Sequence, residues 1–331
     1  MRTAYLIQSH GQAPLLPRLV RRLRAASEGP ILVVHDAREK TLDESALDGT
    51  GTILLQRRES VRRGDFSLLE PYLVGAERLL ASGEQFEWLV YLSAQSYPVR
   101  PVGAIEHDLA TSGADGFIAH WDVTAPDSPW PTRRAQRRYW HQYVRLPDRF
   151  TPWLRLLRPL EAVTPLQFYL TYGALVGWPS RRPPFAGAFR CYGSWQWHSL
   201  HRRCVEHLLA EIAANPELVA YYKHTVVPDE SFIATVLVNS ARFRLVPESR
   251  HYADSHGQPL GHTRVLTEAD LSLVTNGRHD FARKLDPATS AALLDSLDAP
   301  VPVSPSRTAS PDPRPEGRAA APQAQDGAVP T

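Results

Sequence analysis

The sequence has few cysteines, almost no lysine and no excess of charge of either sign. Cys191 and Cys204 are the only cysteines in 331 residues, which argues against a disulfide scaffold. Free thiols in a reducing compartment are expected, with a single bridge as the alternative. The 37 basic and 35 acidic residues leave a formal net charge of +2, so no overall field favours nucleic acid or an anionic membrane as a partner. Any anion-binding site must therefore be local.

Long apolar runs are also missing. No segment approaches the roughly 20 consecutive apolar residues that span a bilayer. The chain runs from Met1 directly into an apolar, strand-like stretch, without the basic region, apolar core and cleavage site of a signal peptide. These absences predict a cytoplasmic protein with no integral membrane segment.

Several motifs for metals and phosphates are absent as well. The sequence has no Asp-any-Asp pair, with which many sugar-nucleotide enzymes hold a divalent cation. It has neither a Walker-type phosphate loop nor a dinucleotide glycine fingerprint, and no His-x-x-x-His or Cys-x-x-Cys zinc spacing. We therefore expect no bound metal and no other cofactor.

The sequence does contain an alternation of short apolar runs with segments of helical periodicity. The expected strands lie at 5–7, 31–34, 51–55, 88–92 and 116–119. The expected helices lie at 15–23, 66–80, 105–109, 200–212, 230–237, 268–274 and 289–297. This order predicts an α/β fold with a mostly parallel sheet that is covered by helices.

The regular pattern breaks in two places. Residues 121–184 are rich in Pro, Trp and Arg, with four arginines at 133, 134, 137 and 138. An irregular surface region that holds a substrate is expected there, or else a solvated basic loop over a small aromatic core. From Ala299 the composition is rich in Pro, Ala and Ser without an apolar period, which predicts a disordered tail over 299–331.

Six segments carry the most specific information. In chain order they are Ala4–Ile7 with Ser9-His10, Ile31–Asp36, Gly64–Leu68, Leu92–Arg100, Val227–Phe232 and Phe281–Asp286. In this order and spacing the chain resembles the Core-2/I-branching N-acetylglucosaminyltransferase family, which also includes the peptide O-xylosyltransferases. The resemblance extends over residues 3–290.

The resemblance implies an inverting, metal-independent transferase with a GT-A-type, Rossmann-like sheet. Such an enzyme moves a sugar from a UDP-sugar donor to a hydroxyl of a glycan, peptide or small molecule; GlcNAc is the expected sugar and xylose the alternative. It further implies one domain over 1–298, with a nucleotide-sugar-binding half at 1–120 and an acceptor-binding, catalytic half at 121–298.

The family's motifs assign roles to single residues. Glu230 falls on the catalytic base, and Lys284 and Arg264 fall on residues that contact the donor diphosphate. The remaining positions are nucleotide contacts at Ser9, His10 and Asp36, and a donor-sugar and acceptor pocket at Ser93, Gln95, Ser96, Trp195, Trp197 and Asp229. For the serine segment a purely structural turn is the alternative, and for the tryptophans an ordinary place in the core.

General chemistry agrees with these roles. In an inverting transfer a single carboxylate takes the proton of the attacking hydroxyl. Glu230 is expected to begin a helix after Pro228, where a carboxylate that only complements the helix dipole is the structural alternative. Arg and Lys can stabilise the leaving diphosphate as a cation would. Neighbours on a strand point to opposite faces, so either Lys284 or Arg283 should face the phosphates; the resemblance favours Lys284.

The chain departs from the family pattern at two places. Arg63-Gly64-Asp65 stands where the family usually has Trp-Gly-Gly, and residues 121–184 align with no family segment, which leaves the acceptor open. Two other classes compete with a transferase. A non-catalytic carbohydrate- or nucleotide-sugar-binding protein would need no base, and a nucleotidyl- or phosphoryl-transfer enzyme would need metal-binding carboxylates.

Overall fold

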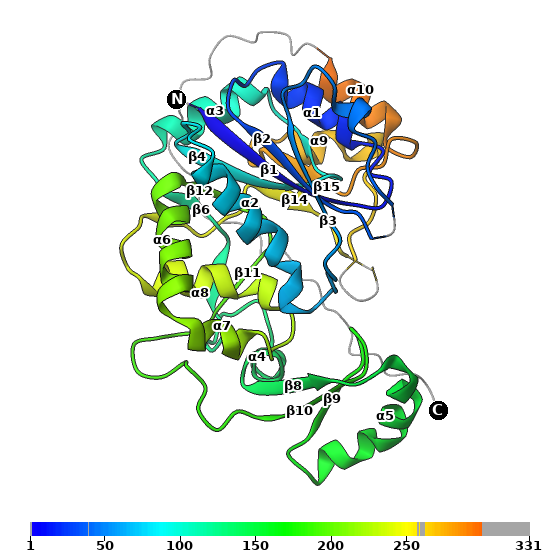
Figure 1. Cartoon of the computed structure of the whole chain (residues 1–331), viewed down its shortest axis with the longest axis vertical. Helices are drawn as coiled ribbons and strands as arrows, with labels where there is room; N and C mark the ends of the chain where they lie inside the picture. The colour runs from blue at the N-terminus through cyan, green and yellow to red at the C-terminus, as the bar shows by residue number, and fades with distance from the viewer. Residues whose placement is uncertain (1, 39, 257, 259–261, 300–331) are drawn as a thin grey trace.

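A seven-stranded sheet forms the centre of the main body of the molecule (Figure 1). The computed structural model describes residues 2–38, 40–256, 258 and 262–299. In sheet order the strands are β13 (Leu245–Val246), β6 (Gly116–Phe117), β12 (Ser199–His201), β4 (Trp88–Ser93), β1 (Thr3–His10), β2 (Ile31–Asp36) and β3 (Ile53–Arg57). Neighbouring strands are parallel except where β12 pairs with β4 and β6. The mostly parallel sheet expected from the sequence is confirmed.

Helices cover both faces of this sheet, as Figure 1 shows. The longer ones are α1 (Leu16–Arg24), α2 (Glu70–Ala81), α3 (Val102–Thr111), α6 (Arg202–Ala214), α7 (Pro216–Tyr222), α8 (Phe232–Asn239) and α10 (Ala291–Asp298). Short helical turns are η1 (Glu44–Leu47), η2 (Phe66–Leu68), η5 (Pro228–Glu230), η7 (Glu268–Asp270) and α9 (Leu271–Val274). This is an α/β fold with a mostly parallel sheet between two layers of helices.

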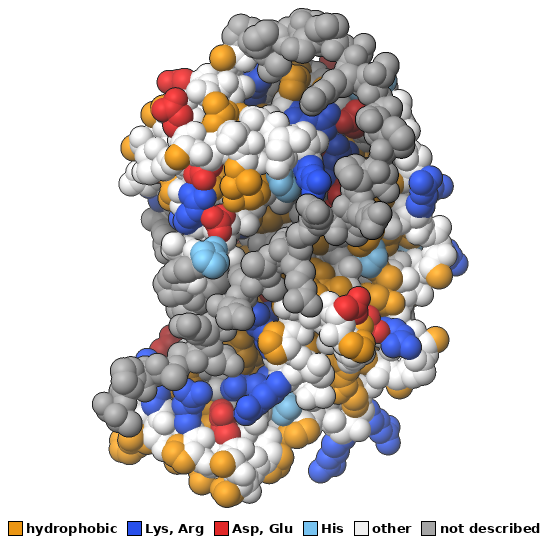
Figure 2. Space-filling model, turned by 180° about the vertical axis from the view of Figure 1, so that it is seen from behind, with side chains coloured by type: hydrophobic (Ala, Val, Ile, Leu, Met, Phe, Trp, Pro, Cys, Tyr) orange, Lys and Arg blue, Asp and Glu red, His pale blue; other side chains and the backbone are white. Residues whose placement is uncertain are grey.

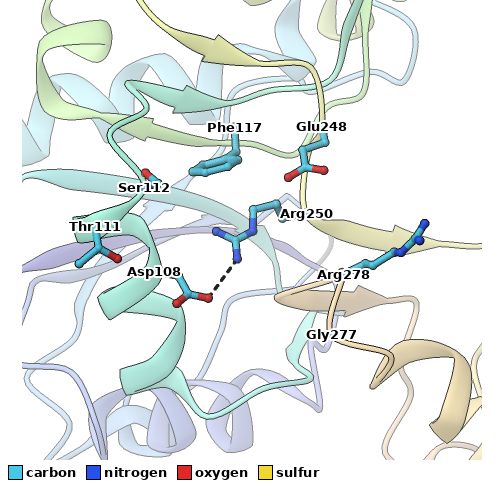
Figure 3. A pocket seen from close by; sticks show the side chains of 8 residues that line it. All are labelled: Asp108, Thr111, Ser112, Phe117, Glu248, Arg250, Gly277 and Arg278. Carbon is cyan, nitrogen blue, oxygen red and sulfur yellow. Dashed lines mark ion pairs between the residues drawn. The ribbon is translucent and has the colours of Figure 1, made fainter. Parts of the chain in front are cut away.

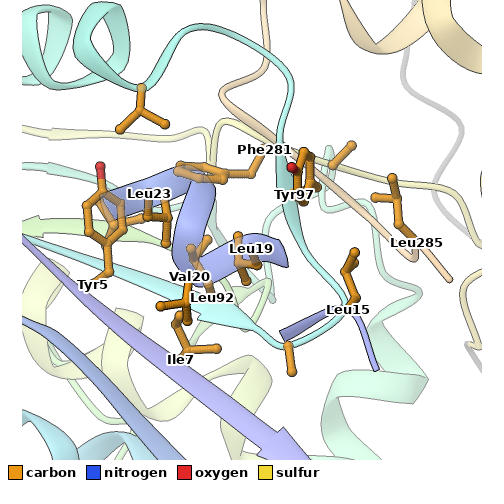
Figure 4. Close-up of a cluster of buried hydrophobic side chains, with 14 of the residues drawn as sticks. Tyr5, Ile7, Leu15, Leu19, Val20, Leu23, Leu92, Tyr97, Phe281 and Leu285 are labelled. Carbon is orange, nitrogen blue, oxygen red and sulfur yellow. The ribbon is translucent and has the colours of Figure 1, made fainter. Parts of the chain in front are cut away.

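Alternate side chains of β1 enter two separate cores on opposite faces of the sheet. Tyr5 and Ile7 pack with α1, α3 and α10, the cluster drawn in Figure 4. Ala4 and Leu6 pack with α2, α6 and α8. Successive side chains of a strand point to opposite faces, so a strand that is covered on both sides must be apolar throughout.

Two small sheets lie beside the large one. One has the order β14 (His251–Ala253), β15 (Phe281–Arg283), β5 (Tyr97–Pro98), and in the other β11 (Tyr192–Ser194) pairs with β7 (His120–Asp122). The first of them places the end of β15 beside the turn that follows β4, because Leu285 donates its backbone N–H to the carbonyl of Gln95 at 3.0 Å.

The expectation of an irregular region at 121–184 was wrong. Much of it forms a separate lobe, residues 132–179, at one end of the molecule (Figure 1). Its elements are α4 (Thr132–Tyr139), β8 (His141–Arg145), η3 (Asp148–Phe150), α5 (Thr151–Leu157), η4 (Arg158–Ala162), β9 (Gln167–Tyr169) and β10 (Leu175–Pro179). The three strands pair antiparallel in the order β8-β10-β9 around small cores of their own. Strands this short give no readable period in the sequence.

Several helix boundaries also differ from expectation. The helix expected at 200–212 begins at Arg202, because residues 199–201 form strand β12, and the helix expected at 268–274 is the turn η7 followed by α9. The helix expected at 66–80 is interrupted after η2, since α2 begins at Glu70. The helix expected at 230–237 begins at Phe232, and Glu230 instead ends the short turn η5 that precedes it. Ser231, between this turn and α8, has φ of −150° and ψ of −46°, outside the helical region, and it separates Glu230 from the helix.

Both cysteines are buried and free, as expected. None of the described helices has the length and apolar character that crossing a membrane requires. The tail expected at 299–331 lies, beyond Ala299, outside the described residues, and the division of the domain into two functional halves stays a prediction.

Candidate active site

A large cleft crosses the carboxyl ends of β1 and β2 and extends to the lobe, with a volume of ≈ 1580 Å³. In open α/β sheets ligands gather at such strand ends. Most of the residues that the sequence points to line it: Ser9, His10, Asp36, Gln95, Trp195, Trp197, Asp229, Glu230, Arg283 and Lys284. Three others, Ser93, Ser96 and Arg264, do not.

The proposed nucleotide contacts lie side by side at the ends of β1 and β2. The strand register pairs Ser9 with His35 and His10 with Asp36. The Ser9 hydroxyl is buried and lies 3.0 Å from Nδ1 of His35. Arg38 hydrogen-bonds Asp36, with Nη2 at 2.6 Å from Oδ2, and these bonds hold the pKa of Asp36 below its usual value.

Ser93, the last residue of β4, and Ser96 form a buried turn. The hydroxyls of Ser93 and Ser96 lie 3.1 Å apart, and the backbone N–H of Gln95 donates to Oγ of Ser93 at 3.2 Å. Both serines are buried, so Gln95 is the member of this segment that reaches the cleft. The geometry matches the structural turn that was the alternative for the two serines.

Two predicted cations line the cleft together. β15 ends at Arg283, so Lys284 lies beyond the strand and the alternation that would separate the two side chains does not apply. The Arg283 guanidinium lies 4.8 Å from the centroid of the Trp197 ring, and burial lowers the pKa of Arg283 to about 10. Arg63, at the first departure from the family pattern, adds a third cation to this wall.

Arg264 has a different setting. Its guanidinium contacts Asp254 at 2.5 Å and Asp270 at 2.6 Å, and it does not line the cleft. A diphosphate contact would require these two carboxylates to release it. The diphosphate role of Arg264 therefore stays a prediction with no support from the geometry.

Glu230 reaches the cleft from η5 and is fixed by Arg138 of α4. Nη1 of Arg138 donates to Oε2 of Glu230 at 2.8 Å, and the Arg138 side chain is only 5% exposed against 29% for Glu230. Burial alone would lower the pKa of Arg138, but the Glu230 charge and the neighbouring tyrosines together raise it well above its usual value. Oε1 of Glu230 accepts no hydrogen bond from the described part of the chain.

Asp229 is the more deeply buried neighbour of Glu230. Burial, followed by the Glu230 charge, raises the pKa of Asp229 to about 7. Its Oδ1 atom has no hydrogen-bond partner among the described residues. Near neutral pH Asp229 is therefore only partly ionised, whereas the adjacent Glu230 is ion-paired with Arg138.

The turn that carries both carboxyls is anchored to two distant segments. Val227 donates its N–H to the Gly64 carbonyl at 3.0 Å, and its own carbonyl accepts from the Tyr139 hydroxyl at 3.0 Å. Gly64 has φ of +75°, and a Cβ there would lie 2.5 Å from a ring carbon of Tyr172 in the lobe. Only glycine fits this contact without displacing a neighbour.

Tryptophans line the wall near Glu230. Trp195 lies 5.1 Å from Trp121 and 6.4 Å from Trp130, measured between ring centroids, and all three line the cleft. Trp197 is 6% exposed and packs on Tyr91, so it belongs to the core as well as to the cleft wall. Faces of this kind suit the apolar face of a sugar ring.

Sequence reasoning missed Arg138, although it named the basic run in which this residue lies. Arg134 and Arg138 are four residues apart on α4 and so share one face, and both line the cleft. Burial, together with the Arg138 charge, lowers the pKa of Arg134. Helical spacing within the basic run was the available signal; the partner 92 residues away was not readable.

A second, smaller hollow of ≈ 600 Å³ contains none of the predicted residues (Figure 3). Arg250 points into it from beside β14, 3.5 Å from Asp108 and 2.9 Å from Asp280, with its guanidinium 4.7 Å from the centroid of the Phe117 ring. Arg100 contacts the same two carboxylates. This hollow is framed by a structural ion-pair network.

The fold and the cleft define an α/β protein with carboxylates, cations and aromatic rings gathered at the strand ends. The chain belongs to the Core-2/I-branching enzyme family, whose characteristic sequence pattern matches residues 3–275.

Two curated relatives come from Arabidopsis thaliana. Beta-glucuronosyltransferase GlcAT14B is 24% identical over 316 residues, which is 90% of this chain and 65% of the relative. Beta-glucuronosyltransferase GlcAT14A is 24% identical over 233 residues, 68% of this chain and 45% of the relative. The chain thus spans less than two thirds of the length of either relative.

Solved structures show only a distant likeness. A 2-C-methyl-D-erythritol 4-phosphate cytidylyltransferase from Thermus thermophilus is 13% identical with a TM-score of 0.34, covering 84% of this chain and 99% of that one. A putative glucose-1-phosphate thymidylyltransferase from Bacillus anthracis is 9% identical with a TM-score of 0.30, covering 67% and 83%.

Proposed function

We propose that this chain is an inverting glycosyltransferase that moves a sugar from a UDP-sugar to an acceptor hydroxyl without a metal, with Glu230 as general base. The observation that carries the proposal is the setting of Glu230. A buried arginine holds one of its carboxylate oxygens at 2.8 Å, in a cleft whose wall also bears Lys284 and Arg283. Membership of the Core-2/I-branching enzyme family supports it.

The carboxylate of Glu230 suits a general base for three reasons. Arg138 fixes its orientation, and its Oε1 is left to accept a proton from a hydroxyl in the cleft. The neighbouring Asp229, with its pKa raised to about 7, carries only part of a negative charge at neutral pH. The tryptophans beside it offer a surface on which an acceptor sugar could stack.

The cations of the cleft suit the leaving group. A nucleoside diphosphate gains negative charge as the glycosidic bond breaks, and fixed Lys and Arg donors stabilise that charge in a partly dry site. Lys284, Arg283 and Arg63 all line the cleft, which supports this role for them. No group of three His, Cys, Asp or Glu side chains that could hold a metal occurs among the described residues. Metal independence stays a prediction for a chelator experiment.

The identity of the donor sugar is the least defined element of the proposed reaction. GlcNAc and xylose follow from the family resemblance, and the names of the two plant relatives add glucuronic acid. The described lining of the cleft has ten Arg or Lys and four Asp or Glu side chains. This excess of cations suits a donor with a carboxylate in addition to its diphosphate. Glycans, peptides and small molecules all remain candidate acceptors.

The experiment is a thermal-shift titration with UDP, UDP-GlcNAc, UDP-xylose and UDP-glucuronic acid, followed by a donor-hydrolysis assay. A ligand that binds only the folded state raises Tm, by an amount that grows with its concentration over Kd. We expect UDP and at least one UDP-sugar to raise Tm, and that sugar to be hydrolysed slowly without acceptor. If neither UDP nor any UDP-sugar shifts Tm, the proposal is wrong.

A further inference from the structure

Exposed large apolar side chains are concentrated on the lobe. Among the described residues nine large hydrophobic side chains are exposed, and eight of them lie between residues 144 and 178. The most exposed are Val163 (79%), Leu156 (73%) and Trp153 (65%). Figure 2 shows hydrophobic side chains gathered at the lower end of the molecule, below a row of basic ones. The ninth, Leu273, lies on α9, far along the chain.

Most of this surface comes from one short segment, residues 149–163, called here the apolar tip. It comprises the end of η3, then α5 and η4. Its exposed apolar side chains are Phe150, Trp153, Leu156, Leu157, Leu160 and Val163. Leu154 is the one that turns inward, where it packs with Phe168 and Ala174.

The spacing of the exposed residues is that of an amphipathic helix turned outward. Trp153, Leu156, Leu157 and Leu160 follow the i, i+3, i+4, i+7 pattern that normally faces a protein core. Here that stripe faces solvent, so the chain itself leaves it uncovered within the described residues. Contiguous exposed apolar surface of this kind marks an interaction site.

The charges of the apolar tip have one sign. Arg149, Arg155 and Arg158 are interleaved with the apolar side chains and are exposed. Glu161, the acidic residue of the segment, turns inward: its side chain is 14% exposed, lies 3.6 Å from Arg137 and accepts the backbone N–H of Phe168 at 2.7 Å. Its charge is therefore withdrawn from the surface. Asp148, at the start of η3, is an exposed carboxylate, but the three arginines outnumber it, so this surface is locally basic although the chain as a whole is near neutral.

We propose that the apolar tip docks this chain on the surface of an anionic lipid bilayer. A short helix with Trp and Leu on one face and Arg155 and Arg158 on another fits the boundary between head groups and acyl chains. The exposed tryptophan suits that boundary because its ring is apolar and its N–H is polar. A second copy of the chain fits less well, because a two-fold contact would bring the same three arginines of each copy together.

The apolar tip and the cleft share residues, so docking would bring the cleft close to the membrane. Arg155 and Arg158 line the cleft as well as belonging to the tip. The cleft therefore opens beside the docked surface, at the level of the lipid head groups. The inference concerns where the protein acts and does not depend on which sugar it transfers.

The test is co-sedimentation of the full-length protein with phosphatidylcholine vesicles, with and without phosphatidylglycerol. We expect binding to the anionic vesicles that weakens with salt. The double variant Trp153→Ser/Leu156→Ser should weaken binding at least tenfold. The matched control Leu273→Ser, which changes an exposed apolar residue elsewhere, should bind as the unaltered chain does.

A second pair of variants tests the charges. Arg155→Gln/Arg158→Gln should weaken binding to anionic vesicles about 25-fold, or about fivefold for each arginine. The control Arg242→Gln, at an exposed site outside the lobe, should have no effect. Thermal melting of all variants should match the unaltered chain, because the altered side chains are exposed.

Several outcomes would overturn the inference. One is the absence of binding to anionic vesicles. Another is equal binding by the serine double variant and Leu273→Ser. A third is a dimer in light scattering that dissociates in the serine double variant while no vesicle binding occurs, which would assign the tip to a second copy. The UDP thermal shift tests the proposed function separately, since it needs no membrane.

Discussion

The substitution Glu230→Gln removes one charge from the cleft and keeps the shape of the side chain. Its amide oxygen can still accept from Nη1 of Arg138, now 2.8 Å from Oε2. What is lost is the capacity to take a proton at Oε1. The substitution therefore separates the proposed base from the structural contact.

The expected loss of activity follows from the role of a general base. Turnover should fall about 10²- to 10⁴-fold, which corresponds to about 3–5.5 kcal/mol in the barrier. Arg138 is 5% exposed and would lose its charged partner, and breaking a buried pair typically costs about 3–5 kcal/mol. The stability loss should be smaller here. Removal of the Glu230 charge lets the neighbouring Asp229 ionise more readily and offset the charge of Arg138.

The assay is donor hydrolysis or transfer by Glu230→Gln and by Asp229→Asn, with UDP binding measured for each by thermal shift. UDP should bind both variants nearly as well as the unaltered chain, because neither residue belongs to the proposed diphosphate contacts. Unchanged turnover in Glu230→Gln would refute the assignment. A large loss in Asp229→Asn alone would transfer the role of base to Asp229.

Three further predictions concern charge in the cleft. Because the pKa of Asp229 is raised to about 7, the folded chain holds a proton that the unfolded chain releases near pH 4. The contribution of Asp229 to the free energy of unfolding should therefore fall by up to about 4 kcal/mol as pH rises from about 4 to 7. In chemical denaturation the stability of Asp229→Asn should decline less over this pH range than that of the unaltered chain. Lys284→Ala should weaken UDP binding about tenfold or more but uridine binding little, whereas the exposed control Lys223→Ala should affect neither; equal losses for UDP and uridine would remove Lys284 from the diphosphate site. Excess EDTA should leave donor hydrolysis unchanged, and loss of activity that Mn²⁺ restores would contradict metal independence.

The sheet was predictable because its determinants are local. Alternate residues of β1 pack into different cores: Tyr5 and Ile7 into one, Ala4 and Leu6 into the other. The lobe was not predictable, since β8 and β10 are short strands that pair across some thirty residues and have no clear period. Their pairing depends on a tertiary contact that no local window contains.

In the candidate site, too, the residues within local motifs were predictable and those defined by distant contacts were not. Glu230, Lys284 and Asp36 were assigned from motifs, and the structure places all three in the cleft. Arg138 was predicted only as part of a basic run, because its ion-pair partner Glu230 is 92 residues away in the sequence. Arg264 was assigned to the diphosphate from its motif position. That position does not reveal that Asp254 and Asp270 pair with its side chain.

The turn at Val227 can form only after distant parts of the chain have folded together. The turn is held by the Gly64 carbonyl and the Tyr139 hydroxyl, and Gly64 in turn lies against Tyr172. These segments are far apart in the sequence, so the setting of Glu230 exists only after all of them have met. Contacts between distant segments form late, because their loops must close first. Recovery of activity after dilution from denaturant should therefore lag behind recovery of helical signal.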